Sequence, residues 1–358
     1  MAMPLVEVLT GLKRTLAQDL PTFATFPLEP LADTGLAHWH VRLAGTRLLA
    51  RIPKQSQMQL PAADNLAYQR ACFERASFGG HAPRLHHVLS PSAHLDRGAL
   101  IVDEIVGRAA RLPADLPAII KALASIHALP TPRSSAPLRN AHDPLADLLA
   151  EVREQGQHLA AARLDSVVRE TIDAGIAQLS ALVAKPARPP KCLIAFDAHP
   201  GNFIVEPGGR AVLVDLEKAR YAYPSLDLAH ATLYTSTTWD VASSAVLSTA
   251  EIADAYCAWA TAFGPSATAH TSWHVPLRRA MWLWSITWCA KWRALSGSSA
   301  KATADGEDWS RDKSSTTLID HVRDRVDHYL SPEIVKHIDS EFAELDAMFA
   351  TQKTPKRR

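Results

Sequence analysis

The sequence has few cysteines and no long hydrophobic run, and both absences exclude classes of protein. Only 4 of its 358 residues are cysteine, and these stand far apart with no C-x-x-C pair. A disulfide framework or a zinc knuckle needs closely spaced cysteines, so we expect reduced, mostly buried thiols, as in a cytoplasmic protein. The most apolar segments, residues 98–107 and 280–292, are short or interrupted by charge, and neither is expected to span a bilayer.

A net charge is also nearly absent. The chain has 38 Lys and Arg against 37 Asp and Glu, which gives a formal net charge of +1. Because binding to nucleic acid or to an anionic membrane usually needs an excess of basic residues, we expect neither kind of partner. The N-terminus lacks the basic segment and apolar run of a signal peptide, so the expected location is the cytoplasm. Nothing in the sequence indicates an oligomeric state.

The chain does contain enough apolar material for two cores. Hydrophobic residues make up 47% of the sequence, which is typical of a globular protein, and 358 residues suggest two domains or lobes. Alternating apolar residues predict strands over residues 31–53, with a turn at Gly45, and further strands near 84–88 and 99–105. A helix is predicted over residues 62–77.

The rest of the chain is predicted to be mainly helical. Helices are expected within residues 112–130, over 143–183 and from Asp227 onward, with a short β segment at 192–214. The predicted fold class is therefore α+β, with a small antiparallel β-rich N-lobe and a larger helical C-lobe.

The composition also predicts where the lobes meet and where order ends. The N-lobe is expected to comprise residues 1–106 and the C-lobe residues 107–358. Small polar residues predict a mobile loop over 297–317, and the basic residues 351–358 predict a frayed tail.

The clearest chemical signal is a predicted hairpin around residues 207–210, Pro-Gly-Gly-Arg, which lie between two apolar stretches. If Glu206 pairs with Ala211, then Asn202 faces Asp215, with Cα atoms about 4.5–5.5 Å apart. Amide and carboxylate oxygens are ligands that suit Mg²⁺. The sequence therefore predicts a magnesium site formed by Asn202 and Asp215.

Asp197 precedes this hairpin by a few residues, on a loop that Pro200 and Gly201 force to turn. A carboxylate there can lie near the metal without binding it. Phosphoryl transfer needs a group at that place to orient a substrate hydroxyl and accept its proton. The spacing D-x4-N, hairpin, Asp therefore predicts a kinase-like site with Asp197 as the catalytic residue.

The same residues resemble a known family. The sequence D-A-H-P-G-N-F-I-V from Asp197, followed by V-D-L-E, looks like the catalytic motif of the aminoglycoside phosphotransferase and choline kinase group, relatives of the protein kinases. Further segments resemble that family's first hairpin, hinge region, following helix and P-x-x-D-L-A segment, in the right order. These segments are residues 34–53, 81–89 with 99–108, 118–130 and 224–229. The resemblance implies a protein-kinase-like two-lobe fold.

Carried over residue by residue, the resemblance implies that Asp197 is the catalytic base or hydroxyl-orienting residue and that Asn202 and Asp215 bind Mg²⁺. Arg51 falls at the position of the family's phosphate-contacting Lys or Arg. Asp227 would be a structural carboxylate that braces the catalytic loop. The backbone of a hinge would recognise the adenine of ATP; this hinge consists of Asp103, Glu104, Ile105 and Val106.

Three departures from the family pattern leave a second function open. Ala195-Phe196 stands where the family commonly has His-Gly, and the glycine-rich loop is reduced to Thr34-Gly35. Gln69 stands where a helix usually supplies a Glu partner to the phosphate-binding cation, and Glu74, one turn on, is a poorer candidate. The alternative is a pseudokinase-like regulatory protein that binds a nucleotide or a metabolite with little turnover.

The sequence allows two interpretations for each of several other side chains. Arg51 is either a phosphate ligand or an exposed strand arginine, with Lys54 the next candidate if the register shifts. His199 is a candidate base or metal ligand, but beside a proline we expect it to support the loop structurally. Glu217 either approaches a second metal or the substrate, or forms a local salt bridge. His127 is expected on a buried helical face.

Tryptophans recur on one predicted helix. Trp284, Trp288 and Trp292 are spaced every four residues, with Trp273 and Trp282 nearby, so they form one stripe. Such a stripe is usually core. The functional alternative is a wall for a cationic or planar substrate, formed by Trp284 and Trp288.

A third hypothesis for the function is a metal-dependent hydrolase that uses His199 and neighbouring carboxylates, but the sequence has no second cluster of His and carboxylates to support it. His81, His86 and His87 lack metal-ligand spacing and are expected at the surface. The motif favours the hypothesis that the protein is a phosphotransferase that needs ATP and Mg²⁺. It would transfer the γ-phosphate to a hydroxyl of a small molecule such as an amino alcohol, a sugar or an aminoglycoside-like compound, and the sequence does not choose among these.

Overall fold

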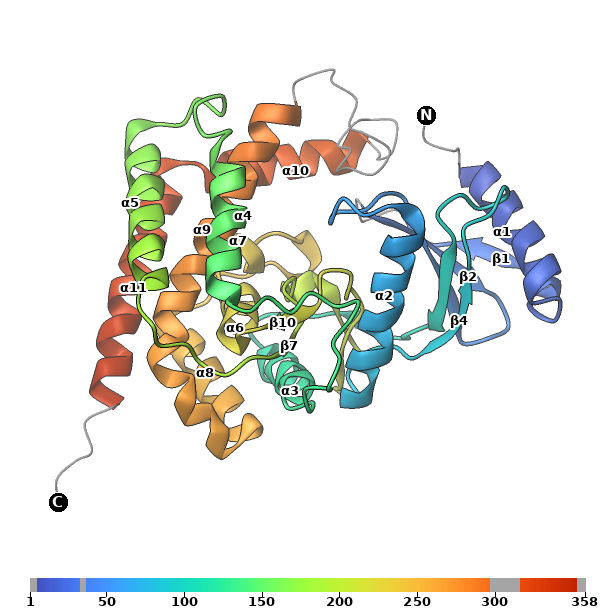
Figure 1. Ribbon diagram of the computed structural model, residues 1–358, viewed down its shortest axis with the longest axis horizontal. Coiled ribbons are helices and arrows are strands. Elements are labelled where there is room, and N and C mark those ends of the chain that lie inside the picture. Colours follow the sequence, from blue (N-terminus) through green and yellow to red (C-terminus); the bar gives the residue numbers. More distant parts are fainter. Residues whose placement is uncertain (1–4, 33–36, 297–315, 353–358) are drawn as a thin grey trace.

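The computed structural model describes residues 5–32, 37–296 and 316–352, and its N-terminal part is built on one antiparallel sheet (Figure 1). The sheet has five strands in the order β1-β2-β3-β5-β4. Their bounds are β1 Leu28–Pro30, β2 His38–Leu43, β3 Leu48–Pro53, β4 Leu85–Leu89 and β5 Ala99–Asp103. The turn between β2 and β3 contains Gly45 at a φ of +84°, so the predicted turn is confirmed.

One helix covers each face of this sheet: α1 (Leu5–Asp19) and α2 (Ala62–Ala76). On β5, Ala99 and Ile101 pack in the same apolar cluster as α1, whereas Leu100 and Val102 pack in the cluster that contains α2. This alternation arises because successive side chains of a strand point to opposite faces. The helix predicted over residues 62–77 is confirmed as α2.

Helix α1 has no counterpart in the sequence-based prediction. It buries Val8, Leu12 and Leu16, spaced four residues apart, against the outer face of the sheet. Gly11 lies on the same side, where a Cβ atom would be 2.0 Å from the carbonyl oxygen of His94. A residue without a side chain is therefore required for α1 to reach the loop between β4 and β5.

The C-terminal part is mainly helical, and α9 runs through its middle, packing against α4, α5, α6 and α10 (Figure 1). The helix bounds are α3 Leu116–His127, α4 Pro144–Gly156, α5 Ser166–Val183, α6 Pro224–Thr232, α7 Tyr234–Thr237, α8 Thr249–Phe263, α9 His274–Ser296, α10 Thr316–Tyr329 and α11 Pro332–Gln352. The predicted α+β architecture, with a β-rich N-terminal part and a larger helical C-terminal part, is confirmed. The position of the lobe boundary stays a prediction.

Two small sheets complete this part, with strand orders β6-β8-β9 and β10-β7. Their bounds are β6 Arg108–Ala109, β7 Cys192–Ile194, β8 Phe203–Val205, β9 Ala211–Leu213 and β10 Arg220–Ala222. Strand β6 follows the five-stranded sheet directly in the chain and pairs with β8. The connection between the two parts is therefore anchored beside the hairpin of β8 and β9.

Two predictions differ from the structure in detail. The helical stretch expected over residues 143–183 is divided into α4 and α5, because Asp165 accepts a hydrogen bond from the backbone N–H of Val167 and caps the start of α5. Of the mobile loop predicted over 297–317, residues 297–315 lie outside the described residues, and Thr316 and Thr317 begin α10. Residues 353–358 of the predicted tail and the sequence Thr34-Gly35 also lie outside them.

None of the helices that the structure describes is both long and apolar enough to cross a bilayer. None of the four cysteines forms a disulfide within the described residues, and three of them are buried, as predicted; Cys257 is exposed.

The docking of α1 can be tested with two equivalent substitutions. Gly11→Ala should lower the free energy of unfolding by about 1–3 kcal/mol, because the new Cβ overlaps the His94 carbonyl. Gly208→Ala is the control, since a Cβ at this position would have no atom within 4 Å, and it should change stability by less than about 0.5 kcal/mol. Urea unfolding of both variants measures the difference. Equal stabilities would show that α1 does not need this close approach.

Candidate active site

The segment that the sequence singles out connects β7 to β9 through a sharply bent loop. Phe196 lies in this loop with a φ of +64°, a backbone conformation that a bulky residue rarely adopts. Its ring is buried between Trp284, at a centroid distance of 5.0 Å, and the guanidinium of Arg220, 3.7 Å from the ring centroid. The strained backbone is therefore held on both sides by packing, and it directs the next residue, Asp197.

Asp227 of α6 also holds this loop. Its carboxylate accepts hydrogen bonds from the backbone N–H groups of Ala195 (2.7 Å) and Phe196 (2.8 Å). His127, buried on α3, lies 3.1 Å from the same carboxylate, and the indole N–H of Trp259 donates to the other nitrogen of this ring at 3.0 Å. Because Trp259 can only donate, Nδ1 of His127 accepts and Nε2–H donates to Asp227. The expected position of His127 on a buried helical face is confirmed, and the chain of bonds ties the loop to α3 and α8.

The hairpin of β8 and β9 forms, but the predicted register is wrong by one residue. Val205 pairs with Ala211, and the backbone N–H of Glu206 donates to the carbonyl of Arg210. The loop therefore contains only Pro207, Gly208 and Gly209, and Gly209 adopts a φ of +81°. A three-residue loop that ends in a left-handed glycine is a common hairpin closure, and it moves every pair by one position.

As a result, Asn202 pairs with Val214, not with Asp215. The backbone N–H of Val214 donates to the carbonyl of Asn202 at 2.9 Å. Asp215 is the next residue along the chain, directly after this pair. The shift thus separates the two predicted ligands by one position along the ribbon and keeps both at its open end.

Asp197 makes a close ion pair that the sequence did not predict. Nζ of Lys218 lies 2.8 Å from one carboxylate oxygen of Asp197, and Nδ1 of His230 lies 3.7 Å from the other. Burial acts to raise the pKa of Asp197, but the charge of Lys218 and its hydrogen bond outweigh this effect and hold the pKa well below its usual range. Asp197 is therefore ionised at neutral pH.

Asp215 forms an ion pair with Arg51 of β3 at 2.5 Å. Arg51 is only 3% exposed, so the reading as an exposed strand arginine is wrong; its position on β3 turns it into the space between sheet and hairpin. Lys54, the fallback, lies with its ammonium 5.5 Å from the ring centroid of Trp39. The arginine thus joins the N-terminal sheet to the segment that follows β9.

Oxygen atoms at the open end of the hairpin remain free to hold a cation. The side-chain N–H of Asn202 donates to the carbonyl of Asp197, and its amide oxygen accepts no hydrogen bond from the described residues. The second carboxylate oxygen of Asp215, Oδ2, accepts no hydrogen bond from the described residues either. Oε1 of the buried Glu217 also has no hydrogen-bond partner among the described residues. This oxygen-only donor set fits a hard divalent cation such as Mg²⁺.

Glu217 and Trp284 have different polar contacts. Glu217 is 5% exposed, and its carboxyl group lies 3.7 Å from Nε2 of His38. Burial, followed by the charge of Asp215, raises the pKa of Glu217 to about 8. Trp284 is partly buried and donates from its indole N–H to Glu151 at 2.8 Å.

The tryptophan stripe divides between core and surface. Trp282 and Trp292 are buried in the helical core, as the usual reading of such a stripe predicts. Trp288 is partly buried, 5.9 Å from the ring of Trp239. The ammonium of Lys218 lies 5.8 Å from the ring centroid of Trp284, which places this tryptophan beside the ion pair of Asp197.

The hinge residues connect β5 to β6. The carboxylate of Asp103 accepts a hydrogen bond from the backbone N–H of Arg84 and pairs with His86, and Glu104 pairs with Arg42. The backbone N–H groups of the two residues that follow donate no hydrogen bond within the described residues. These two residues are Ile105 and Val106, and Val106 is 58% exposed.

His199 lies within the loop between β7 and β8, with its ring centroid 6.1 Å from that of His230 and with no hydrogen-bond partner for Nδ1 among the described residues. The cluster of His81, His86 and His87 is intermediate to exposed. The described residues contain no group of three or more His, Cys, Asp or Glu that could hold a metal ion.

Sequence reasoning missed three side chains at this site. Lys218 follows the V-D-L-E motif directly and was visible in the sequence, but nothing in the spacing links it to Asp197. Asp240 lies against the loop, where a Cβ on Gly201 would be 2.8 Å from its carboxylate oxygen. Glu151 binds Trp284 as well as the guanidinium groups of Arg139 and Arg220, and it comes from a helix far away in the sequence; Glu151 belongs to α4.

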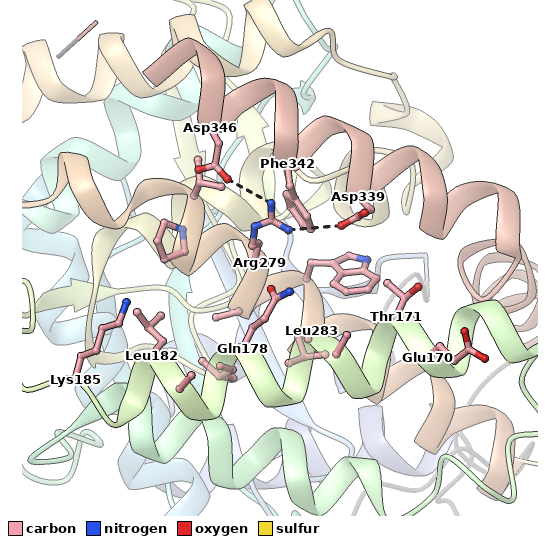
Figure 2. A pocket seen from close by; sticks show the side chains of 18 residues that line it. Glu170, Thr171, Gln178, Leu182, Lys185, Arg279, Leu283, Asp339, Phe342 and Asp346 are labelled. Atoms are coloured by element: carbon pink, nitrogen blue, oxygen red, sulfur yellow. Dashed lines mark hydrogen bonds and ion pairs between the residues drawn. The ribbon is translucent and has the colours of Figure 1, made fainter. Parts of the chain in front are cut away.

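A cavity of about 570 Å³ lies elsewhere, between α5, α9 and α11. Figure 2 shows Arg279 reaching from α9 to Asp339 and Asp346 of α11, with Gln178 and Leu182 of α5 opposite. No predicted site residue lines it. The cavity is therefore separate from the candidate active site.

Comparison with protein-family models identifies a family for this part of the chain. A model of the phosphotransferase enzyme family matches residues 29–269, which is more than half of the chain and includes the whole loop and hairpin. No curated protein matches the sequence significantly.

Solved structures of similar fold cover nearly the whole chain. A choline/ethanolamine kinase family protein from Mesorhizobium loti has a TM-score of 0.58 at 18% identity, covering 94% of this chain and 99% of its own. An aminoglycoside phosphotransferase from Alicyclobacillus acidocaldarius has a TM-score of 0.56 at 18% identity, with coverages of 90% and 92%. A GDP complex of aminoglycoside 2'-phosphotransferase-IIIa has a TM-score of 0.58 at 13% identity, with coverages of 90% and 98%. At these identities the likeness shows the fold, and it confirms the predicted kinase-like architecture.

The contribution of Asp227 to stability can be measured directly. Asp227→Asn should lower the free energy of unfolding by about 2–3 kcal/mol, because an amide offers one acceptor oxygen to the two buried N–H groups. Asp173→Asn, which weakens an exposed pair with Arg169, should change it by less than about 0.5 kcal/mol. If urea unfolding gives equal values for the two variants, Asp227 does not hold the loop.

Proposed function

The chain belongs to the phosphotransferase enzyme family, and we propose that it transfers the γ-phosphate of ATP, with Mg²⁺, to a hydroxyl group of a small molecule. The observation that carries this proposal is the meeting of Asp197, Asn202 and Asp215 around one loop and hairpin, with a buried Arg51 against Asp215. The acceptor class is an amino alcohol, a sugar or an aminoglycoside-like compound.

In this proposal Asn202 and Asp215 hold the metal. Their free amide and carboxylate oxygens, described above, support that role, and Mg²⁺ when bound would neutralise charge on the phosphates. The unpaired Oε1 of Glu217 is a further oxygen close to Asp215 in the chain. Asn202 also fixes the loop, because its amide N–H donates to the carbonyl of Asp197.

Arg51 and the hinge would bind the nucleotide. Nε of Arg51 is buried without a hydrogen-bond partner among the described residues, which supports a role as donor to a phosphate oxygen. The free backbone N–H groups of Ile105 and Val106 support recognition of the adenine edge by the hinge, together with Asp103 and Glu104.

Asp197 would orient the acceptor hydroxyl and take its proton. Its carboxylate is ionised, since Lys218 offsets the cost of its burial, so it is ready to accept a hydrogen bond. An incoming hydroxyl shares this carboxylate with Lys218, which keeps one oxygen occupied. Positioning and charge stabilisation, not covalent chemistry, carry the reaction in such a site. Trp284, beside Lys218, is the nearer candidate for a wall of the acceptor site, with Trp288 behind it.

Replacing Asp197 tests the function. Purified protein with Mg-ATP is screened against hydroxyl-bearing metabolites and antibiotics for stimulated release of ADP. Asp197→Asn should lower turnover about 10²–10⁴-fold while leaving the affinity for Mg-ATP unchanged by calorimetry. Asp173→Asn serves as the surface control.

Two results would contradict parts of this account. Full turnover in Asp197→Asn would remove Asp197 from the mechanism. Binding of Mg-ATP by the wild-type protein without turnover on any acceptor would favour the regulatory, pseudokinase-like alternative.

The proposed metal ligand Asp215 can be tested by binding alone. In the wild-type protein the affinity for ATP should rise when Mg²⁺ is added, and in Asp215→Ala this dependence should be lost, with at least a roughly tenfold weaker affinity for Mg-ATP. Asp215→Asn keeps the shape of the side chain and separates loss of the ligand from the loss of a partner for Arg51. An unchanged dependence on Mg²⁺ in both variants, measured by calorimetry, would contradict the ligand role.

A further inference from the structure

Arg51 is a buried cation whose position is fixed by two histidines as well as by Asp215. One terminal nitrogen of its guanidinium lies 3.1 Å from Nδ1 of His38, and the other lies 3.3 Å from Nε2 of His40. Both histidines belong to β2, the strand next to β3. Since Arg51 is 3% exposed, its orientation depends on these partners and not on water.

His38 continues the contact to helix α2. Its second ring nitrogen, Nε2, lies 3.0 Å from Oε1 of Gln69, and both side chains are buried, at 3% and 1% exposure. Gln69 is the residue at the place where the family resemblance led us to expect an acidic partner. Helix α2 therefore reaches Arg51 indirectly, through His38.

Arg51 determines the direction of the hydrogen bonds that run from its guanidinium through His38 to Gln69. A guanidinium can only donate, so Nδ1 of His38 must be the unprotonated nitrogen and accept. The ring proton then lies on Nε2, which donates, so Gln69 must present its amide oxygen. Burial, followed by the charge of Arg51, holds the pKa of His38 well below its usual value, which agrees with a neutral ring.

We infer that His38 and Gln69 are positioning residues that couple helix α2 to the phosphate-binding Arg51 through an uncharged hydrogen-bond relay. The inference rests on the proposed function for the role of Arg51, and it assigns the task of an acidic helix residue to a neutral pair. The relay orients the guanidinium between β3 and the hairpin, and neither His38 nor Gln69 needs to touch the nucleotide.

The surrounding charges explain why a neutral relay suits this chain. Arg51 already faces the carboxylate of Asp215, and Glu217 lies 3.7 Å from His38 in the same buried region. A third carboxylate on α2 would place three acids around one arginine, at a high cost of burial. Glu74, the other acidic residue considered on α2, is half exposed and pairs with Arg70 at the surface.

The tautomer of His38 tests the relay without nucleotide. Nitrogen NMR of the histidine side chains, with His38 assigned by comparison with His38→Asn, should show a protonated Nε2 and an unprotonated Nδ1 in the wild-type protein. Gln69→Leu removes the acceptor at similar volume, and it should change the nitrogen shifts of His38. Glu74→Gln, the matched variant on the same helix, should leave them unchanged.

Kinetics test the coupling. Gln69→Leu should raise the KM for ATP about tenfold, as expected for loss of one hydrogen bond that aligns a charged group, with little change in the KM for the acceptor. His38→Leu should act in the same way, and the double variant should be no worse than the more severe single one, because both cut one chain of bonds. Glu74→Gln should leave both KM values unchanged. Thermal unfolding is measured for each variant.

The outcomes separate this inference from the function on which it rests. A protonated Nδ1 in His38, additive effects of the two substitutions, or a rise in the ATP KM with Glu74→Gln would overturn the relay even if turnover is normal. The predicted tautomer in a protein that neither binds nor turns over ATP would confirm the hydrogen bonds, overturn the proposed function, and overturn the phosphate-positioning role with it.

Discussion

The ion pair between Arg51 and Asp215 connects the two parts of the molecule at the point where chemistry is proposed. Arg51 comes from β3 of the five-stranded sheet, and Asp215 follows the small hairpin of the helical part. Because the guanidinium is buried, this pair stabilises the protein only if further hydrogen bonds hold each partner in place and offset the cost of removing the charges from water. The histidines of β2 fix the arginine, and the braced loop and hairpin fix the carboxylate.

The loop and hairpin of the proposed site could be predicted from the sequence because their signals are local. The spacing of Asp197, Asn202 and Asp215, with a turn sequence between them, depends on residues within one short stretch of chain. The register failed at one point: the turn sequence Pro-Gly-Gly-Arg allows a three- or a four-residue loop, and the left-handed conformation of Gly209 selects the shorter one. A slip of one residue is invisible to composition but decides which side chains are paired.

The supporting contacts could not be read in this way because they join distant elements. Lys218 meets Asp197 and His38 meets Gln69 only after the chain has folded, and no periodicity predicts either contact. The same holds for helix α1, whose apolar spacing is visible but whose docking depends on the close approach of Gly11 to the distant loop that contains His94. Buried polar contacts of this kind set the charge states of the site, so electrostatics was the least predictable part.

The most direct test of the central claim is a crystal structure of the wild-type protein with Mg²⁺ and a non-hydrolysable ATP analogue. The account predicts metal density on the amide oxygen of Asn202 and the carboxylate of Asp215, phosphates against Arg51, and the terminal phosphate facing Asp197. A nucleotide bound elsewhere, or a metal that touches neither Asn202 nor Asp215, would contradict it.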